Sequence, residues 1–143
     1  TPVENNHPDN IAFLYDLLKR IGFKRVSLVS PEKHDEMIAF TSQLCHVIAV
    51  ALINSDDPER NTVQYIGDSY RDLTRIAKIN EDLWSELFQE NKQELLRAMD
   101  DFEAQFALMK EAVQNDDLAS MRTQFKESTK RRKQLEDADL KKR

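Results

Sequence analysis

The stretch from Ser30 to Asn54 constrains the fold of this chain more than any other part of the sequence. Ser30 can cap a helix, and Pro31 suits the first helical position. The second half is apolar on nearly every side of a helix, through Leu44, Val47, Ile48, Ala49, Val50, Ala51, Leu52 and Ile53. Such a helix is covered by other elements rather than laid on a surface. We therefore expect a central helix over residues 31–54 that further helices wrap.

Two polar side chains interrupt this helix four positions apart. Ser42 and His46 therefore lie on one side of it, and buried polar groups need a partner or a ligand. We take both as candidate binding residues. The alternative is a hydroxyl bonded back to its own helix and a satisfied core histidine. Cys45, in the same run, is interpreted as a small buried hydrophobe rather than as a nucleophile.

The composition favours an all-helical body, because only two of the 143 residues are glycine and 33% are charged. The net charge of -5 argues against nucleic acid as a partner. A single cysteine excludes an internal disulfide and favours a reducing compartment. No apolar run reaches the roughly 20 residues of a membrane span. We expect a cytoplasmic protein with no nucleic-acid or membrane partner.

The N-terminal segment predicts a helix that starts at Asn6 or Asp9 and ends before Gly22. Residues 23–30 then predict one short strand, built on Val26, Leu28 and Val29. A lone strand has unsatisfied edges. It pairs either with another copy or, as we prefer, with a sheet that lies upstream of this sequence.

After the central helix, Ser69-Tyr-Arg-Asp72 has the form of a capping box and predicts a helix to about Ala77. Another helix is predicted from Asn80 to about Glu90. A second capping box at Asn91-Lys-Gln-Glu94 predicts a break there.

The longest helix is predicted from that break to about Asn115. Its apolar residues follow the 4-3-4-3-4 spacing of a coiled coil, at Leu95, Met99, Phe102, Phe106, Met109 and Val113. This seam packs either within one chain or between two. Asn115-Asp-Asp117 then caps a last helix. Beyond Lys126 the chain is basic, through Lys130–Lys133 and Lys141–Arg143, and we expect a solvated, fraying end rather than a binding patch.

Arg71 and Arg75 lie four apart on the helix that Ser69 is predicted to cap. Two guanidinium groups near a helix N-terminus form a receptor for carboxylate or phosphate. The alternative is two surface arginines that pair with nearby acids, namely Asp68, Asp72 or Asp82. His34-Asp35 is interpreted as a local hydrogen-bonding pair rather than as a catalytic dyad.

The sequence lacks the motifs of two kinds of site, a metal site and a dinucleotide site. No histidine or cysteine spacing suggests a metal site. The glycine-rich loop of a dinucleotide site is also missing, so we expect no tight nicotinamide binding by this chain alone.

Several segments in order carry a family resemblance: Pro31-Glu-Lys-His-Asp35, Ser42-Gln-Leu-Cys-His46-Val-Ile-Ala, Gly67-Asp-Ser-Tyr-Arg-Asp-Leu-Thr-Arg-Ile-Ala77, Asp82-Leu-Trp84 and Asn91. Together they resemble prephenate dehydrogenase over about residues 1–115. That family joins a Rossmann domain to a helical domain that dimerises the enzyme and closes the active site. The resemblance implies a mainly α fold, a helical bundle like the C-terminal domain of 6-phosphogluconate dehydrogenase. Residues 1–30 would be the remnant of a truncated nucleotide-binding domain, and residues 31–143 the dimerisation and substrate-binding domain.

The resemblance also implies roles for single residues. Ser42 and His46 match a Ser-x-x-x-His pair that faces the substrate. Arg75 matches the arginine that grips a carboxylate of prephenate, and Arg71 matches a basic position at the pocket rim. The family's catalytic histidine has no counterpart, so no catalytic residue is expected in this chain.

The sequence departs from the family pattern at three positions. Gln43 and Cys45 stand where relatives often carry His and Pro, and Asp68 stands where Gly is common. The negative charge of Asp68 leaves arogenate, which carries an ammonium group, open as the substrate.

The implied activity is the oxidative decarboxylation of prephenate to 4-hydroxyphenylpyruvate in tyrosine biosynthesis, with NAD or NADP. The cofactor would bind the other half of the enzyme, so this chain alone would hold none and be inactive. It would form a homodimer through its long helices. The alternatives are an arogenate dehydrogenase, another dehydrogenase of the same plan, or a non-enzymatic helical interaction module. In that module Arg71 and Arg75 are surface residues and His46 is a core residue.

Overall fold

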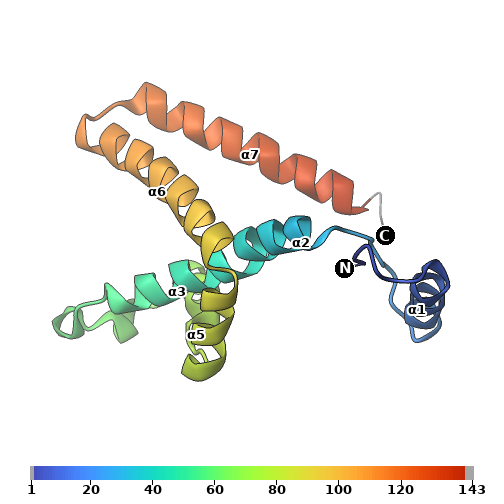
Figure 1. The fold of residues 1–143 in the computed structure, drawn as a ribbon. Coiled ribbons are helices and arrows are strands. Elements are labelled where there is room, and N and C mark those ends of the chain that lie inside the picture. The colour runs from blue at the N-terminus through green and yellow to red at the C-terminus, as the bar shows by residue number, and fades with distance from the viewer. Residues whose placement is uncertain (1, 141–143) are drawn as a thin grey trace. The chain divides into compact units, whose positions relative to one another are not determined.

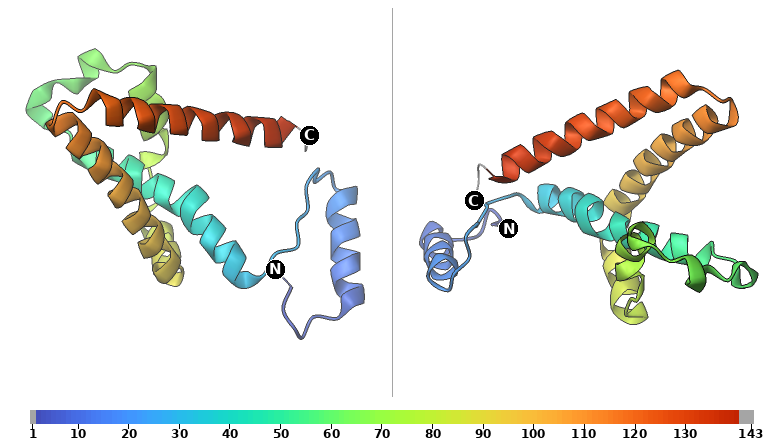
Figure 2. Two further views of the ribbon diagram at one scale, coloured as in Figure 1. Left: turned by 90° about the horizontal axis from the view of Figure 1, so that it is seen from above. Right: turned by 180° about the vertical axis from the view of Figure 1, so that it is seen from behind.

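Helices form nearly all the regular structure of the computed structural model, which describes residues 2–140 (Figure 1). Figure 2 shows them from two further directions. The α-helices are α1 (Pro8–Arg20), α2 (Pro31–Ile38), α3 (Leu44–Asn54), α4 (Asp68–Thr74), α5 (Glu81–Glu90), α6 (Lys92–Gln114) and α7 (Leu118–Leu140). The predicted mainly α fold is confirmed.

The described residues divide into two compact units. The first contains residues 2–3 and Val29–Met99, and the second contains Glu4–Leu28 and residues 100–140. Each unit is described by itself below.

The strand predicted within residues 23–30 is not observed, since no strand is assigned anywhere in residues 2–140, and it stays a prediction. A strand is defined by hydrogen bonds to a neighbouring strand, and the described chain offers no such neighbour. The helix before this segment ends as predicted. Gly22 has φ +103°, in the left-handed region that glycine favours after a helix.

The central helix is present over residues 31–54, but it contains a π turn, η1 (Ala39–Gln43), between α2 and α3. Ser30 caps it as predicted, since its hydroxyl accepts a hydrogen bond from the Lys33 N–H at 3.2 Å. At the π turn the Leu44 N–H bonds the carbonyl of Ala39, five residues back. The turn adds one residue to the helical winding, which apolar periodicity does not reveal.

The central helix is covered less than its sequence predicts. In α3 only Leu44 and Ala49 are buried, and Ile53 is 40% exposed. Leu44 joins a small core with Ala39 and Ala98. Cys45 is exposed, so its predicted burial was wrong. No other element of the first unit covers its side of the helix.

The stretch Pro31–Asn54 is also long and apolar enough, by length and composition alone, to cross a membrane. The expectation that no stretch reaches this length was therefore wrong. The core helix of a soluble protein passes the same test, so the finding is weak evidence for a membrane span.

The predicted break at Asn91 is confirmed, because α5 ends at Glu90 and α6 begins at Lys92. The cap of the last helix is confirmed as well. Asp117 accepts hydrogen bonds from the Ser120 N–H at 2.9 Å and from the Ser120 hydroxyl at 2.6 Å. The residue before it, Asp116, adopts a left-handed φ of 52° that reverses the chain.

The predicted fraying beyond Lys126 was wrong for residues 126–140, which remain helical. Ion pairs along α7 contribute to this, among them Arg131–Glu127 at 3.2 Å. In the same unit the Arg25 guanidinium reaches the Asp139 carboxylate at 2.6 Å. Residues 141–143 lie outside the described residues.

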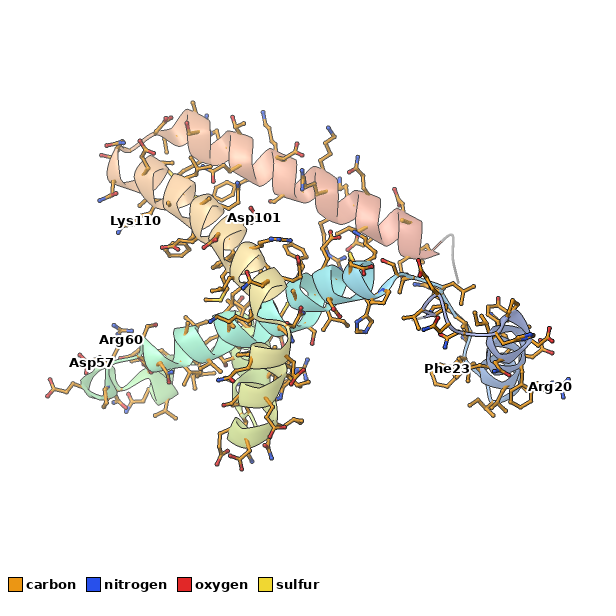
Figure 3. All side chains as sticks on the ribbon, viewed as in Figure 1. Arg20, Phe23, Asp57, Arg60, Asp101 and Lys110 are labelled. Carbon is orange, nitrogen blue, oxygen red and sulfur yellow. The ribbon has the colours of Figure 1, made fainter. Side chains whose placement is uncertain are left out.

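The apolar seam of α6 is covered at its N-terminal end only. In the first unit, Leu95 is 5% exposed. In the second unit, Phe106 is 63% and Val113 is 56% exposed. Figure 3 labels Asp101 and Lys110 on this second stretch of α6. Within the second unit, the described residues of that unit therefore leave this part of the seam largely uncovered.

Candidate functional site

His46 lies in the first turn of α3, and a backbone carbonyl fixes its ring. Its Nδ1 is 2.9 Å from the carbonyl oxygen of Ser42. Because a carbonyl oxygen only accepts, Nδ1 carries the proton in the neutral ring and Nε2 has the free lone pair. Nε2 can therefore accept a hydrogen bond from a ligand hydroxyl or, once protonated, donate one to a carboxylate.

Trp84 of α5 holds the same imidazole by stacking. The two ring centroids lie 3.7 Å apart with 30° between the ring planes. Phe88, one turn further along α5, meets the indole edge-on at 5.7 Å. Sequence reasoning gave Trp84 no role, because no local pattern connects it to α3. The stack leaves the His46 ring half-buried and restricted in orientation.

The Ser42 hydroxyl forms no hydrogen bond within residues 2–140. The predicted alternative, a hydroxyl bonded back to its own helix, occurs at the preceding residue instead. There Thr41 Oγ1 donates to the Met37 carbonyl at 2.6 Å. Ser42 is half-buried and contributes its carbonyl to His46, so its hydroxyl remains available to a ligand.

Arg71 and Arg75 lie in different local structures. Arg71 is in α4, whereas Arg75 begins a 3₁₀ turn, η4 (Arg75–Ala77). The predicted capping box at Ser69 was wrong, since Gly67 is the N-cap and no side chain caps the helix. Both α4 and η4 pack against α3, the helix that carries His46.

The two arginines also differ in their partners. Arg71 Nη1 bonds the Asp68 carboxylate at 2.9 Å, which is one of the surface pairs predicted as the alternative. Arg75 forms no ion pair or hydrogen bond with any residue in the described range 2–140. Its guanidinium is therefore the one of the two that is free to receive an anionic group.

A buried amide network adjoins Ser42 and was missed by sequence reasoning. Gln43 is 3% exposed, and its Nε2 donates to the Leu87 carbonyl at 2.9 Å. Asn91 Nδ2 donates to Gln43 Oε1 and to the Asp35 carbonyl, each at 2.9 Å. The available signal was a glutamine inside an apolar helix, which we treated only as a departure from the family pattern.

The remaining polar candidates form no further site. His34 Nδ1 and Asp35 Oδ1 are 2.9 Å apart on the surface, which confirms the predicted local pair. Within residues 2–140 no group of three metal-ligating side chains comes together. The two glycines, Gly22 and Gly67, follow α1 and precede the seven-residue α4. Neither lies between a strand and a helix, so the residues present do not fit a dinucleotide loop.

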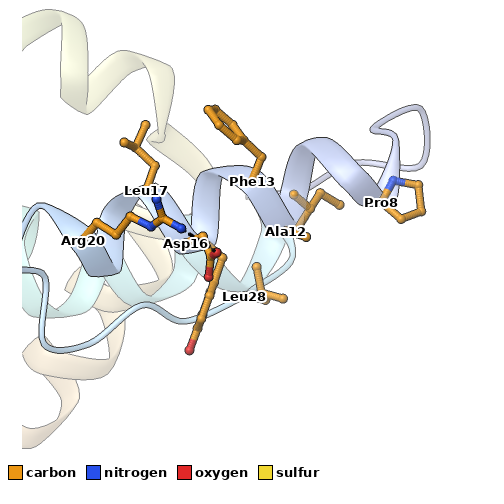
Figure 4. A pocket seen from close by; sticks show the side chains of 9 residues that line it. Pro8, Ala12, Phe13, Asp16, Leu17, Arg20 and Leu28 are labelled. Atoms are coloured by element: carbon orange, nitrogen blue, oxygen red, sulfur yellow. Dashed lines mark ion pairs between the residues drawn. The ribbon is translucent and has the colours of Figure 1, made fainter.

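An open hollow of about 720 Å³ lies in the second unit beside α1 (Figure 4). Its lining is mostly apolar, with Phe13, Leu17 and Leu28 in Figure 4, and the pair Asp16–Arg20 at 3.9 Å along one side. None of the predicted site residues lines it.

Known proteins resemble this chain over most of its length. The family described as the dimerization domain of prephenate dehydrogenase matches residues 30–127. Cyclohexadienyl dehydrogenase of Zymomonas mobilis is 34% identical over 146 residues, which cover 98% of this chain and 50% of the relative. Prephenate dehydrogenase of Bacillus subtilis is 25% identical over 130 residues, which cover 88% of this chain and 35% of the relative. The chain thus spans half or less of the length of these relatives.

Solved structures give the same result. Prephenate dehydrogenase from A. aeolicus, in complex with hydroxyphenyl propionate and NAD+, superposes with a TM-score of 0.83 at 28% identity. The match covers 94% of this chain and 48% of that one. Synechocystis arogenate dehydrogenase superposes with a TM-score of 0.82 at 21% identity, over 94% of this chain and 50% of that one. At this lower identity the likeness shows the fold alone.

Proposed function

Because this chain belongs to the prephenate dehydrogenase family, we propose that it supplies the dimerisation and substrate-carboxylate-binding part of such an enzyme. The proposed reaction is the oxidative decarboxylation of prephenate to 4-hydroxyphenylpyruvate, in tyrosine biosynthesis in the cytoplasm. Residues 31–143 form the helical domain in this proposal, and residues 1–30 are the end of a nucleotide-binding domain. The chain alone is inactive, because its residues do not fit the dinucleotide.

The observation that carries the proposal is the unpaired guanidinium of Arg75 in a turn packed against the helix that bears His46. Prephenate is a dicarboxylate, and a hydrogen bond to a charged group contributes on the order of 1.5–3 kcal/mol. In the proposed site Arg75 binds a carboxylate, while Ser42 and His46 contact the same small molecule. Arg71 lies at the rim, where Asp68 already neutralises it.

The chemistry assigned to this chain is binding and orientation. NAD or NADP, held by the rest of the enzyme, supplies the hydride acceptor when it is bound. Arg75 and His46 fix the substrate's position, and an oriented reactant reacts far faster than a freely diffusing one. No residue of this chain is proposed to transfer a proton in the reaction.

The proposed assembly is a homodimer through α6 and α7. Large apolar side chains remain exposed on this part of the chain, including Phe106 at 63%, Leu118 at 61% and Phe125 at 56%. Exposed apolar side chains in such number typically mark an interface. A second copy of the chain is the occupant that the family's description as a dimerization domain supports.

The pair Asp68–Arg71 favours arogenate as a second candidate substrate. The Asp68 side chain is 95% exposed and 2.9 Å from Arg71, so a carboxylate lies beside the proposed rim residue. Arogenate carries an ammonium group, which a carboxylate binds. Asp68→Asn in the full-length enzyme then lowers kcat/KM for arogenate more than for prephenate. Equal effects on the two substrates would exclude this role for Asp68.

The direct test of the proposal is Arg75→Ala in the full-length enzyme. We expect KM for prephenate to rise at least about tenfold, or about 1.4 kcal/mol, with a smaller change in kcat. The matched control is Arg97→Ala, because Arg97 is an exposed arginine bonded to Glu94 on α6. An unchanged KM in Arg75→Ala removes Arg75 from the site.

A further inference from the structure

We propose that Gln43 and Asn91 form an amide clamp that fixes the π turn and thereby orients Ser42 and His46. Both would be positioning residues, which act on a ligand through their neighbours. The inference deepens the proposed function, because only that function makes Ser42 and His46 substrate-binding residues.

The π turn is stabilised by hydrogen bonds from side chains outside the helix backbone. A π turn is a rare departure from regular α-helix, and it occurs frequently at functional sites. Gln43 is its last residue, and it is the only buried polar side chain among residues 2–140. An unsatisfied amide at such a position is costly. Here the amide is satisfied at both ends, by the Leu87 carbonyl and by Asn91.

Asn91 spans the π turn from one side to the other. One bond of its side-chain amide goes to the carbonyl of Asp35 in α2, before the turn, and the other goes to Gln43 at its end. Asn91 is the single residue between α5 and α6, with φ −111° and ψ 28°. A residue anchored between two helices thus bonds both sides of the extra helical residue.

The Gln43 hydrogen bond and the stacking of His46 on Trp84 occur along the same contact between two helical segments. Gln43 bonds the carbonyl of Leu87, and three residues later His46 stacks on Trp84, three residues before Leu87. The helical segment of Gln43 and α5 therefore run antiparallel along this contact. A shift of α5 that breaks the Gln43 bond also displaces Trp84 from the imidazole. Ser42, directly before Gln43, moves with the same turn.

The test is an NMR measurement on the full chain that needs no enzymatic activity. In the wild-type chain we expect the neutral His46 ring as the Nδ1–H tautomer, with its ring protons shifted upfield by the Trp84 indole. Gln43→Met keeps the length of the side chain but removes both hydrogen bonds. It should lose most of that upfield shift, and Asn91→Ala should do the same.

The control and a double variant sharpen this result. Gln89→Met, at an exposed glutamine of α5, should leave the His46 signals unchanged. Gln43→Met combined with Asn91→Ala should lose no more than either single variant, because all the bonds belong to one network. Gln43→His should restore much of the shift, since an imidazole also has one donor and one acceptor. Unchanged His46 signals in Gln43→Met overturn the proposal.

The proposal remains testable if these variants fail to fold. The wild-type chain must then show slow exchange of the Gln43 side-chain amide protons together with the shifted His46 ring. A fast-exchanging Gln43 amide or an unshifted ring contradicts the clamp.

A kinetic measurement tests whether the clamp affects substrate binding. In the full-length enzyme, Gln43→Met should raise KM for prephenate by about tenfold and leave kcat within about twofold. An unchanged KM beside an altered His46 ring overturns the positioning role. If the wild-type enzyme does not bind prephenate at all, the proposed function fails, and the NMR arm still decides whether the clamp exists.

Discussion

Two regions differ in how their side chains are covered: the residues around the π turn, called the junction here, and the helices α6 and α7. At the junction, the buried amide of Gln43 has its partners within one chain, and the His46 ring is held on one face by Trp84 and at Nδ1 by Ser42. Along α6 and α7, aromatic side chains such as Phe106 are exposed. The first region satisfies its polar groups within a single chain, whereas the second leaves large apolar side chains exposed.

The difference extends to the polar interactions of the two regions. The ion pairs of α7, such as Arg131–Glu127, lie between exposed side chains, where a pair contributes about 0–1 kcal/mol. The hydrogen bonds of the Gln43 side-chain amide are shielded from water. When one partner is removed, a buried polar group that is left without a hydrogen bond destabilises the fold by its full desolvation free energy. Stability should therefore depend strongly on few residues at the junction and weakly on many along α7.

The largest expected effect is at the exposed aromatic surface. Phe106→Asp places a charge where a second copy is proposed to pack, and we expect the dimer dissociation constant to rise at least about 100-fold, or about 2.7 kcal/mol. Gln105→Asp introduces the same charge at the neighbouring position and serves as the control. Sedimentation equilibrium measures both. Association of Phe106→Asp with wild-type affinity would show that this surface is not the interface.

A smaller effect, on the free energy of unfolding, is expected when the hydrogen bonds of Gln43 are removed. Gln43→Ala removes two shielded hydrogen bonds, one to the Leu87 carbonyl and one from the Asn91 amide, and leaves a cavity in place of a buried side chain. The free energy of unfolding should therefore fall by about 2–3 kcal/mol. Arg131→Ala, which removes one surface ion pair of α7, should change it by at most about 1 kcal/mol. Urea unfolding at one fixed protein concentration compares them, because dimerisation adds to the apparent stability. Equal losses would remove the contrast between the two regions.

The smallest effect concerns the cap of α7. Hydrogen bonds from the Ser120 hydroxyl and N–H hold the pKa of Asp117 below its ordinary value. A carboxyl with a depressed pKa stabilises the folded state above its unfolded-state pKa, and the contribution is lost as pH falls through the folded-state pKa. Acid should therefore weaken the cap at the N-terminal turn of α7.

Carboxyl carbon NMR of Asp117 checks this cap directly. Ser120→Ala should raise the pKa of Asp117 toward its ordinary value. Ser128→Ala, further along α7, is the control and should leave that pKa unchanged. A pKa of Asp117 that does not move in Ser120→Ala would show that the hydroxyl bond does not set it.

Local signals explain what the sequence predicted correctly. The Ser30 cap, the end of α1 before Gly22, the break at Asn91 and the Asp117 cap each depend on residues a few positions apart. The pair Arg71–Asp68 was foreseen for the same reason. Interactions of this kind are specified within one or two turns of chain.

The features that the sequence did not predict depend on residues that lie far apart in the chain. The Trp84–His46 stack and the Gln43–Asn91 bond join segments far apart in sequence, and no periodicity encodes them. The exposure of Cys45 was missed because the apolar sequence of a helix does not show which of its sides other elements cover. The strand predicted at residues 23–30 stays untested, because a strand requires a partner, which the described residues do not contain.

The most direct measurement of the central claim is a crystal structure of the full-length enzyme with hydroxyphenyl propionate bound. We predict the ligand's carboxylate within hydrogen-bonding distance of the Arg75 guanidinium, with the His46 ring still stacked on Trp84 and its Nε2 facing the ligand. A ligand bound elsewhere, with Arg75 paired to an acidic side chain of its own or the second copy, would contradict the assignment of this domain to substrate binding.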